Sequence, residues 1–461
     1  MHPLLAHDLK HADELLDRTR AYAAAVVAGL AERPVTVRPE PPAHRPLPPA
    51  GIGFDAALDD FRARWAPGFS GSAGPRYLGF VTGGATPAGI AGDWLTAAFD
   101  QNPTAGLDST APDLERETIA WLRDLFGLSD AQHGCFVTGA TMSNAVGLAI
   151  GREWIGETKG ICVSQEGLAA LGAVTVLSGA PHSSIYKGLS LLGIGRKSLR
   201  RLPSLPQREA VDLEALEQAL RELKGEPAIV VANCGTVNTV DFDDLAAIVA
   251  LKRRYPFWLH VDAAFGGFAA LLPEHAHLVA ALDAADSICI DCHKWLNVPY
   301  DSAVQFTRRR DLQSRVFQNN AAYLGMPLEN PDFVHLTPEN SRRLRALAAW
   351  FALASYGRDG QRDIVARNIE AARTLGERIG QEPRLRLLAP VRMNVVCFTL
   401  ADAPTESRIQ SFVERLRDDG EAFLTPTVLH GVWALRAAFS NWRTTPEDVD
   451  RIFDAVRRAC P

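Results

Sequence analysis

Residues 287–297 read SICIDCHKWLN, a short apolar run that leads into Lys294. The run is rich in β-forming residues, so we expect a buried strand that ends just before the lysine. Burial disfavours an ammonium ion and predicts a lowered pKa for Lys294. A lysine that loses its proton can form a Schiff base with an aldehyde cofactor. The alternative is a lysine at a strand end whose charge reaches solvent.

The length and composition describe a protein with more than one domain. A chain of 461 residues exceeds one ordinary hydrophobic core, so we expect a large domain and at least one smaller one. The net charge of -6 provides no basic surface for nucleic acid. No apolar run of about 20 residues predicts a membrane span, and the start, MHPLLAHD, does not resemble a signal peptide. We therefore expect a cytoplasmic protein without nucleic-acid or membrane partners.

The seven cysteines are scattered and odd in number, as expected for reduced thiols. Only Cys289 and Cys292 have motif spacing. A zinc site would need a second pair of ligands, and we find no convincing one. A redox pair would need a helix start to activate the thiol. We therefore predict no metal site.

The sequence divides into three regions. Residues 1–66 form a helical arm with a proline-rich linker at 34–49, which either docks on a partner subunit or is a surface appendage. Residues 67–340 alternate strands with helices, which indicates an α/β domain with a mostly parallel sheet. Residues 341–461 begin with long helices and continue as a small α+β unit. Strands are expected at 134–138, 161–163, 228–232, 258–262, 287–291, 302–307, 394–400 and 433–439, and helices at 114–125, 143–154, 243–254, 341–356, 361–379, 406–418 and 446–458.

Residues 138–144, TGATMSN, follow one of these strands and open a helix. Small residues let the backbone approach an anion, which the free N–H groups and the positive helix end then bind. Thr141 and Ser143 would add hydroxyl donors. The alternative is a tight strand–helix turn with an N-cap.

Asp262 ends another apolar strand, in the segment HVDAAFGG at 260–267. A carboxylate there is costly unless it meets a cation, and the protonated pyridine nitrogen of pyridoxal phosphate is such a cation. Ala264 is small enough for a flat ring to lie over it. The alternative is an aspartate that caps the next helix.

His182 follows a short β-like run, in the segment PHSSIYK at 181–187. A histidine at a strand end could stack on a cofactor ring and exchange protons. A lone histidine is more often structural, but the neighbouring segments favour the functional role.

In order along the chain, these segments resemble the group II amino-acid decarboxylases of the fold type I pyridoxal-phosphate enzymes. That family includes aromatic-L-amino-acid decarboxylase and glutamate decarboxylase. The resemblance covers most of the chain and implies a mostly parallel, seven-stranded large domain beside a small C-terminal domain. The matching segments are 75–80 (PRYLGF), 138–144, 182–184 (HSS), 235–236 (GT), 242–245 (FDDL), 260–264, 293–296 (HKWL), and 342–343 (RR) with the helix that follows.

The resemblance also implies a role for each matched residue. Lys294 would carry pyridoxal 5′-phosphate as a Schiff base, Asp262 would pair with its pyridine nitrogen, and His182 and Ala264 would lie on opposite ring faces. The other cofactor contacts would be Ala140, Thr141, Ser143, Thr236 and His293, and the substrate pocket would include Phe80 and Thr82. The family forms homodimers with active sites at the interface, which would give the N-terminal arm a purpose.

The implied reaction is decarboxylation of an L-amino acid through an external aldimine and a quinonoid. Here the protein supplies orientation and the fixed charge of Asp262. The residues Trp295 and Leu296 and a fairly apolar pocket favour an aromatic or bulky substrate.

One matched position departs from the family. Its decarboxylases carry a tyrosine on a loop that reaches the partner's active site and helps to protonate the product carbon. Counting back from Arg342, the corresponding residue is Phe333, which has no proton to donate, although His335 or His182 could. In the family, loss of that hydroxyl is associated with oxidative release of an aldehyde. An aldehyde synthase therefore stays open, as do another pyridoxal-phosphate lyase, a transaminase and a non-catalytic binding protein.

Asp291 is a second departure, because a relative has an amide at this position beside the phosphate. An acid near a phosphate is unfavourable. Either Asp291 points elsewhere or the pocket is rebuilt.

Overall fold

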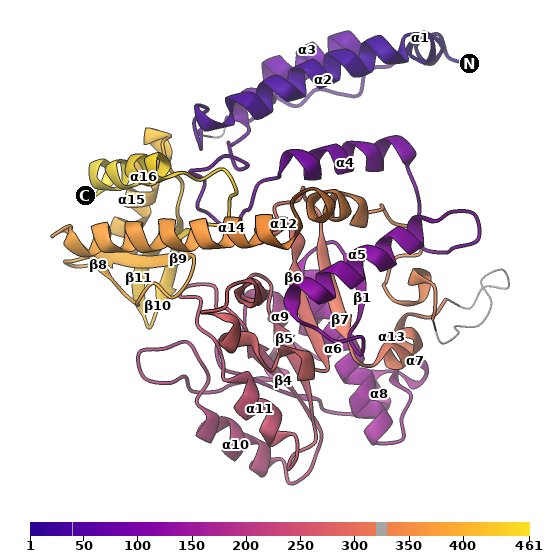
Figure 1. Cartoon of the computed structure of the whole chain (residues 1–461), viewed down its shortest axis with the longest axis vertical. Helices are drawn as coiled ribbons and strands as arrows, with labels where there is room; N and C mark the ends of the chain where they lie inside the picture. Colours follow the sequence, from indigo (N-terminus) through magenta and orange to yellow (C-terminus); the bar gives the residue numbers. More distant parts are fainter. Residues whose placement is uncertain (39, 320–329) are drawn as a thin grey trace.

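The computed structural model describes residues 1–38, 40–319 and 330–461. The N-terminal arm consists of α1 (Pro3–Lys10), α2 (Ala12–Ala28), η1 (Gly29–Ala31), α3 (Phe54–Arg64) and η2 (Ala66–Gly68). No residue of α1, α2 or α3 is buried. In Figure 1 these helices lie beside one another, set apart from the rest of the molecule.

Within the described residues, the large domain contains a seven-stranded sheet in the order β1-β7-β6-β5-β4-β2-β3. Strands β3, β2, β4, β5 and β6 run parallel, whereas β7 is antiparallel to both of its neighbours. The strands are β1 (His133–Val137), β2 (Thr175–Ser178), β3 (Leu199–Arg201), β4 (Ala228–Asn233), β5 (Phe257–Asp262), β6 (Ser287–Asp291) and β7 (Ala303–Thr307). The predicted α/β class with a mostly parallel sheet is confirmed.

Helices flank this sheet (Figure 1), and α6 packs on the central strands β5, β6 and β7. Two glycines allow the close approach: a Cβ on Gly147 would lie 2.5 Å from Nδ1 of His260, and one on Gly151 would lie 2.8 Å from the Trp258 ring. The α-helices of this region are α4 (Pro87–Phe99), α5 (Ala111–Phe126), α6 (Ala140–Thr158), α7 (Val163–Glu166), α8 (Leu168–Leu171), α9 (Ser183–Leu191), α10 (Leu213–Glu222), α11 (Leu245–Leu251), α12 (Cys292–Trp295) and α13 (Arg310–Phe317). The 3-10 turns are η3 (Arg196–Ser198), η4 (Gly266–Leu271), η5 (Ala276–Val279), η6 (Leu282–Ala284) and η7 (Phe333–His335).

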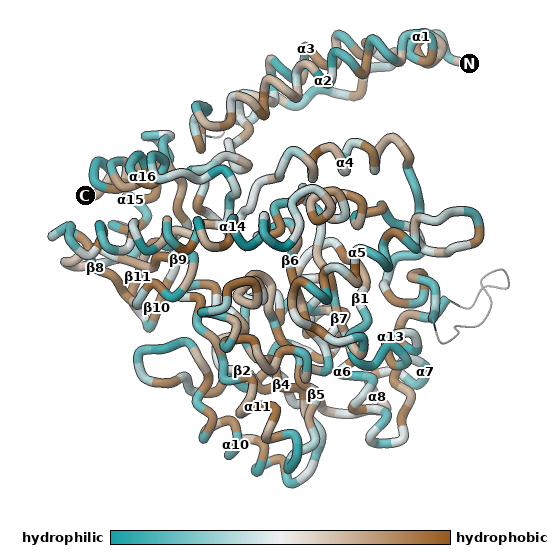
Figure 2. The backbone as a smooth tube through the Cα atoms, viewed as in Figure 1, coloured by the Kyte–Doolittle hydropathy of each residue, from teal (hydrophilic) through white to brown (hydrophobic). Residues whose placement is uncertain are grey.

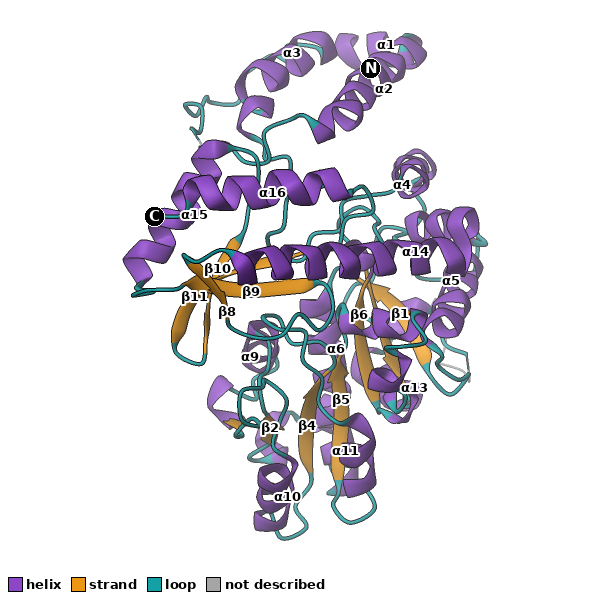
Figure 3. Ribbon diagram, turned by 60° about the vertical axis from the view of Figure 1, so that its left-hand side comes forward, coloured by secondary structure: helices purple, strands orange, loops and turns teal. Residues whose placement is uncertain are grey.

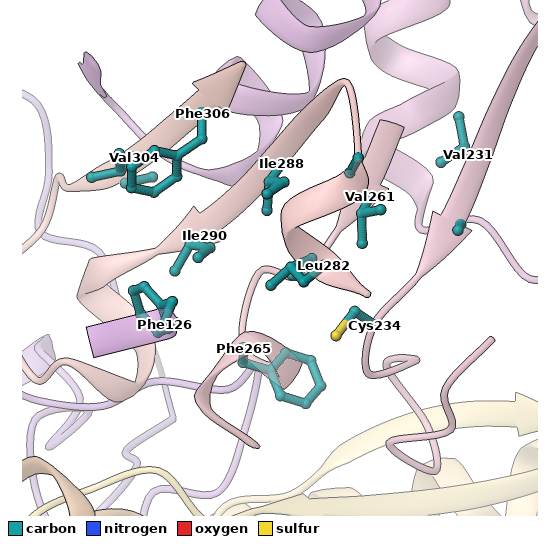
Figure 4. Packing of buried hydrophobic residues seen from close by; sticks show 14 of the residues in the cluster. Phe126, Val231, Cys234, Val261, Phe265, Leu282, Ile288, Ile290, Val304 and Phe306 are labelled. Carbon is teal, nitrogen blue, oxygen red and sulfur yellow. The ribbon is translucent and has the colours of Figure 1, made fainter. Parts of the chain in front are cut away.

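The main core lies between the strands and these helices. All residues of β4, β5, β6 and β7 are buried. Figure 4 shows Ile288 and Ile290 of β6 near Val304 and Phe306 of β7. Figure 2 shows hydrophobic stretches along the central strands and hydrophilic ones in outer helices and loops. Strands buried on both faces read as continuous apolar runs, which is why the sequence predicted them well.

The C-terminal region forms a second unit with its own core and an antiparallel sheet in the order β10-β11-β9-β8 (Figure 3). Its elements are α14 (Ala346–Gln381), β8 (Leu385–Leu387), β9 (Val395–Leu400), α15 (Glu406–Asp419), β10 (Thr425–Leu429), β11 (Val432–Ala438) and α16 (Pro446–Ala459). Helix α14 is interrupted at Gly357, where φ is 58°, between the two helices that the sequence predicted. Leu78 packs into the core of this unit, and the predicted domain boundaries at 66/67 and 340/341 remain predictions.

The predicted strand at 161–163 is wrong, because helix α7 begins at Val163. Glutamates bind the backbone here: Glu166 accepts from Cys162 N (2.8 Å), and Glu153 accepts from Ser164 N (3.0 Å). The two carboxylates thus accept backbone N–H groups that a neighbouring strand would have bonded if the apolar run had formed a strand. In the part of the chain that the structure describes, no helix is both long and apolar enough to cross a bilayer.

Candidate active site

A cavity of about 630 Å³ opens beyond the carboxyl ends of the parallel strands. Strands β4, β5 and β6, the start of α6 and strand β11 of the small unit all contribute to its wall. The predicted residues that line it are Phe80, Ala140, Thr141, His182, Thr236, Asp262, Ala264, His293 and Lys294. Ligands bind at this edge of open α/β sheets, so the position itself indicates an active site.

Lys294 lies in α12, directly after β6. Its Nζ is 3.0 Å from Oδ2 of Asp291 and 5.6 Å from the centroid of the Phe265 ring. The predicted lowering of its pKa is wrong. Burial does act to lower the pKa of Lys294, but the carboxylates of Asp291 and Asp262 together outweigh it and raise that pKa. In this structure Lys294 is therefore an ammonium ion held by a buried carboxylate.

Asp262 lies at the end of β5 with its carboxylate at the cavity. Its Oδ2 accepts from Asn144 Nδ2 (2.9 Å), and its Oδ1 accepts from Ala264 N (3.2 Å). Among the described residues, no ion pair within 4 Å involves Asp262. A buried carboxylate that is oriented by donors and has no described cation within 4 Å fits a protonated ring nitrogen of a ligand.

A buried hydrogen-bond chain fixes the amide of Asn144. Its Oδ1 is 2.9 Å from Nε2 of His260, and Nδ1 of His260 is 2.8 Å from Oγ of Ser287. The Asn144 NH₂ group donates to Asp262 and Ser184, so Asn144 Oδ1 must accept from His260 Nε2. A neutral His260 ring then accepts at Nδ1 from the Ser287 hydroxyl, whose oxygen also accepts from Trp258 Nε1 (2.9 Å). Burial lowers the pKa of His260 to about 4, which keeps the ring neutral as this chain requires.

His182 is held at the cavity wall by Ser184. The backbone N–H of Ser184 can only donate, and it lies 3.2 Å from Nδ1 of His182. Nδ1 is therefore an acceptor, and the neutral ring carries its proton on Nε2. Burial lowers the pKa of His182, and the opposing carboxylate of Asp262 does not offset this effect.

The start of α6 is where the sequence predicted an anion site. Ala140 N donates to Oδ1 of Asp291 (2.7 Å), so a carboxylate of the protein itself binds there. Thr141 lines the cavity. Ser143 does not, among the described residues, because it is fully buried and its hydroxyl donates to Val304 O (3.3 Å). The structure thus places Ala140 and Thr141, but not Ser143, at the cavity.

The loop after β4 carries Thr236, whose hydroxyl is bonded on both sides. It donates to Oε2 of Glu209 (2.6 Å) and accepts from Asp241 N (2.9 Å). Arg436 of β11 reaches the same loop and donates to Val237 O (3.0 Å). Both Glu209 and Arg436 line the cavity.

Sequence reasoning missed Glu209, Arg436 and the role of Asn144. A signal existed for Arg436, because it is a charged residue inside the otherwise apolar strand β11. Asn144 lay within the recognised segment 138–144 but was read only as part of a turn. Glu209 lies in an irregular loop between β3 and α10, which carries no periodic signal.

Of the two predicted substrate residues near position 80, the structure places one at the cavity and one away from it. Phe80 lines the cavity and is 62% exposed. Thr82 is buried and donates to Gly79 O (3.2 Å), and among the described residues it is not part of the cavity wall.

Phe333 and His335 also lie away from the described wall of this cavity. The Phe333 ring is buried between two guanidinium groups, those of Arg116 (5.3 Å) and Arg342 (5.2 Å). His335 Nδ1 accepts from Asn319 N (3.0 Å), and burial lowers the pKa of His335. Within its own chain, the Phe333 ring is buried beside the ion pair of Arg342 with Glu115.

These residues fit pyridoxal 5′-phosphate. Asp262 offers the oriented carboxylate for a ring nitrogen, His182 and Ala264 border the space beside it, and the start of α6 offers backbone donors for a phosphate. Lys294 lies between these two ends and would bind the aldehyde.

Residues 45–401 match the pyridoxal-dependent decarboxylase conserved domain. Aromatic-L-amino-acid decarboxylase of Bacillus atrophaeus is 28% identical over 397 residues, which cover 83% of this chain and 80% of that protein. Phenylacetaldehyde synthase of Petunia hybrida is 26% identical over 446 residues, covering 90% and 86%. The crystal structure of Oryza sativa TDC with PLP and tryptamine has the same fold, with a TM-score of 0.90 at 23% identity over 100% of this chain and 99% of the other. The chain therefore belongs to the pyridoxal-dependent decarboxylase family and is a carboxy-lyase that uses pyridoxal 5′-phosphate.

Proposed function

We propose that this carboxy-lyase removes the α-carboxyl group of an L-amino acid with an aromatic or bulky side chain. The observation that carries the proposal is the composition of the cavity wall. Arg201, Lys294 and Arg436 supply cations, and the remainder includes the carboxylates of Glu209, Asp262 and Asp291 and the apolar or aromatic residues Phe80, Val81, Met142, Tyr186 and Phe265. Such a wall suits a substrate with one carboxylate and a large apolar side chain. The names of the related proteins from Bacillus atrophaeus and Petunia hybrida support an aromatic substrate.

Arg436 is the proposed carboxylate partner. Its side chain is buried, Nη1 is used by Val237 O, and Nε has no hydrogen-bond partner in the described structure. A buried guanidinium with a free donor favours a carboxylate ligand, since the pair combines charge with directed hydrogen bonds.

His182 and Asp262 have complementary proposed roles. The bound cofactor supplies an electron sink for the bond that breaks. Asp262, oriented by Asn144, would keep the ring nitrogen protonated. His182 carries its proton on Nε2 and is the proposed donor to the carbon that loses the carboxylate.

The test is incubation of the holoenzyme with a panel of aromatic, aliphatic and acidic L-amino acids, under air and under nitrogen. We expect CO₂ and the amine from aromatic members at equal rates in both atmospheres. An acidic amino acid preferred over every aromatic one would overturn the substrate proposal.

A second candidate is oxidative release of an aldehyde, favoured by the Petunia hybrida relative and by Phe333, which matches the position of the family's loop tyrosine. It predicts oxygen uptake, peroxide and aldehyde in air. A shift toward amine in Phe333→Tyr would support it, and amine alone from the unaltered enzyme would eliminate it.

We further propose that the enzyme is a homodimer in which the N-terminal arm contacts the partner. Helices α1, α2 and α3 of the arm bury none of their residues, and Leu5, Leu9 and Leu16 are each more than 60% exposed. Exposed apolar faces of this kind mark interfaces. Light scattering should give twice the chain mass of 50.1 kDa. Leu9→Glu/Leu16→Glu should lower the mass toward that of one chain, while Leu47→Glu in the linker should not.

A further inference from the structure

Asp291 binds a backbone donor of the segment that is predicted to hold the cofactor's phosphate. Its side chain is 2% exposed, Oδ1 accepts the N–H of Ala140 at the start of α6 (2.7 Å), and Oδ2 contacts Lys294 Nζ (3.0 Å). Nε2 of His293 lies 3.5 Å from Oδ1. The carboxylate therefore neutralises the lysine and uses a backbone donor of the anion site.

The surroundings of Asp291 hold few other charges. The facing groups are the Lys294 ammonium and His293 of α12, the start of α6, His182 before α9, and Asp262 of β5, which also acts on Lys294. Asp301 acts on His293 from the next loop. The Cys289 and Cys292 thiols are buried beside Asp291, and burial raises their pKa values, so both remain uncharged.

This arrangement conflicts with a bound phosphate. A carboxylate and a phosphate dianion repel each other, and both need the donor on Ala140. The conflict is removed when Asp291 carries a proton, because a carboxylic acid can donate to a phosphate oxygen as an amide would. A proton source is in contact: when the N–H bond of the Lys294 ammonium breaks and an O–H bond forms on Asp291, both groups become neutral, and the lysine becomes the nucleophilic amine.

We propose that Asp291 is the counter-ion of Lys294 in the cofactor-free protein and binds the cofactor's phosphate as a neutral acid that holds the former lysine proton. The inference rests on cofactor use and not on which substrate bond breaks, so its test is separate from that of the proposed function.

The test compares two ligands, pyridoxal 5′-phosphate and pyridoxal, which lacks the phosphate. Dissociation constants for the cofactor-free protein are measured by absorbance titration between pH 7 and pH 9, where the phosphate stays dianionic. The ratio of the pyridoxal constant to the pyridoxal phosphate constant isolates the phosphate's contribution, because changes in Lys294 reactivity affect both ligands alike.

For the unaltered protein, this ratio should fall with rising pH, by up to about tenfold per pH unit over the range in which Asp291 is protonated in the pyridoxal phosphate complex and ionised in the pyridoxal complex. In Asp291→Asn the ratio should be independent of pH and higher at pH 9. Asp301→Asn is the matched control, since it removes a nearby negative charge without touching Ala140, and its ratio should follow the unaltered protein.

Two outcomes would overturn the proposal. Equal ratios in the unaltered protein and Asp291→Asn would mean that Asp291 does not meet the phosphate. If the ratio does not change with pH in either protein but is higher in Asp291→Asn, Asp291 stays ionised in the complex. If this variant does not fold, calorimetry of the unaltered protein in two buffers at pH 9 decides, because only a protonated Asp291 requires more proton uptake with pyridoxal phosphate than with pyridoxal.

Discussion

At the level of single residues, the site depends on polar side chains that are oriented by buried hydrogen-bond partners. Asp262 and His182 face the cavity, but Asn144 and Ser184 beneath them determine which atoms donate and which accept. His260 completes the arrangement only as a neutral ring. Buried residues therefore determine which atoms of the site donate hydrogen bonds and which accept them.

His260 should make stability depend on pH. Its pKa is about 4 in the folded protein and near 6.5 unfolded, so the unfolded state binds more protons below pH 6.5. The contribution of neutral His260 to the free energy of unfolding is fully present above pH 6.5. About 3 kcal/mol of it is lost as pH falls toward 4. In His260→Gln, denaturant titrations should show a shallower loss of unfolding free energy over this range. Replacement of solvent-exposed His430 by glutamine should leave the slope unchanged, and equal slopes for both variants would refute the assignment.

At the scale of elements, the close approach of α6 to β5 positions Asn144 against Asp262. Gly147→Ala should destabilise the protein by about 1–3 kcal/mol, because its Cβ would overlap the His260 ring. Gly380→Ala in α14 meets nothing within 4 Å and should stabilise by about 0.5–1 kcal/mol. Thermal unfolding of both variants tests this, and an unchanged Tm for Gly147→Ala would show that α6 can move away from the sheet.

A buried ion pair joins α5, β1 and the segment before α14. Glu115 accepts two bonds from Arg342 (2.7 and 2.9 Å) and one from Phe136 N (3.1 Å), and neither side chain of the pair is more than 1% exposed. Arg342→Met leaves a buried carboxylate alone and should cost about 3–5 kcal/mol. The double variant with Glu115→Gln should be more stable than Arg342→Met by itself. Denaturant titrations in which the second change gives no recovery would contradict this account.

At the scale of the whole molecule, the sequence predicted most of the fold, because buried parallel strands are continuous apolar runs and the helices between them are periodic. It failed at 161–163, where Glu153 and Glu166 bind the backbone of a short apolar segment. It also located Lys294, Asp262 and His182, because each is a polar residue at a strand end. Glu209 and the pairing of Lys294 with Asp291 could not be predicted, since they depend on contacts between segments far apart in the sequence.

The proposed function requires Lys294 for loss of the α-carboxyl group from an aromatic or bulky L-amino acid. It is tested most directly with carboxyl-¹³C-labelled L-amino acids, by measuring labelled CO₂ from the unaltered enzyme and from Lys294→Ala at saturating pyridoxal phosphate. We expect labelled CO₂ from aromatic members with the unaltered enzyme, and a loss of at least about a thousandfold in Lys294→Ala. No labelled CO₂ from any member, or an undiminished rate in Lys294→Ala, would contradict the claim.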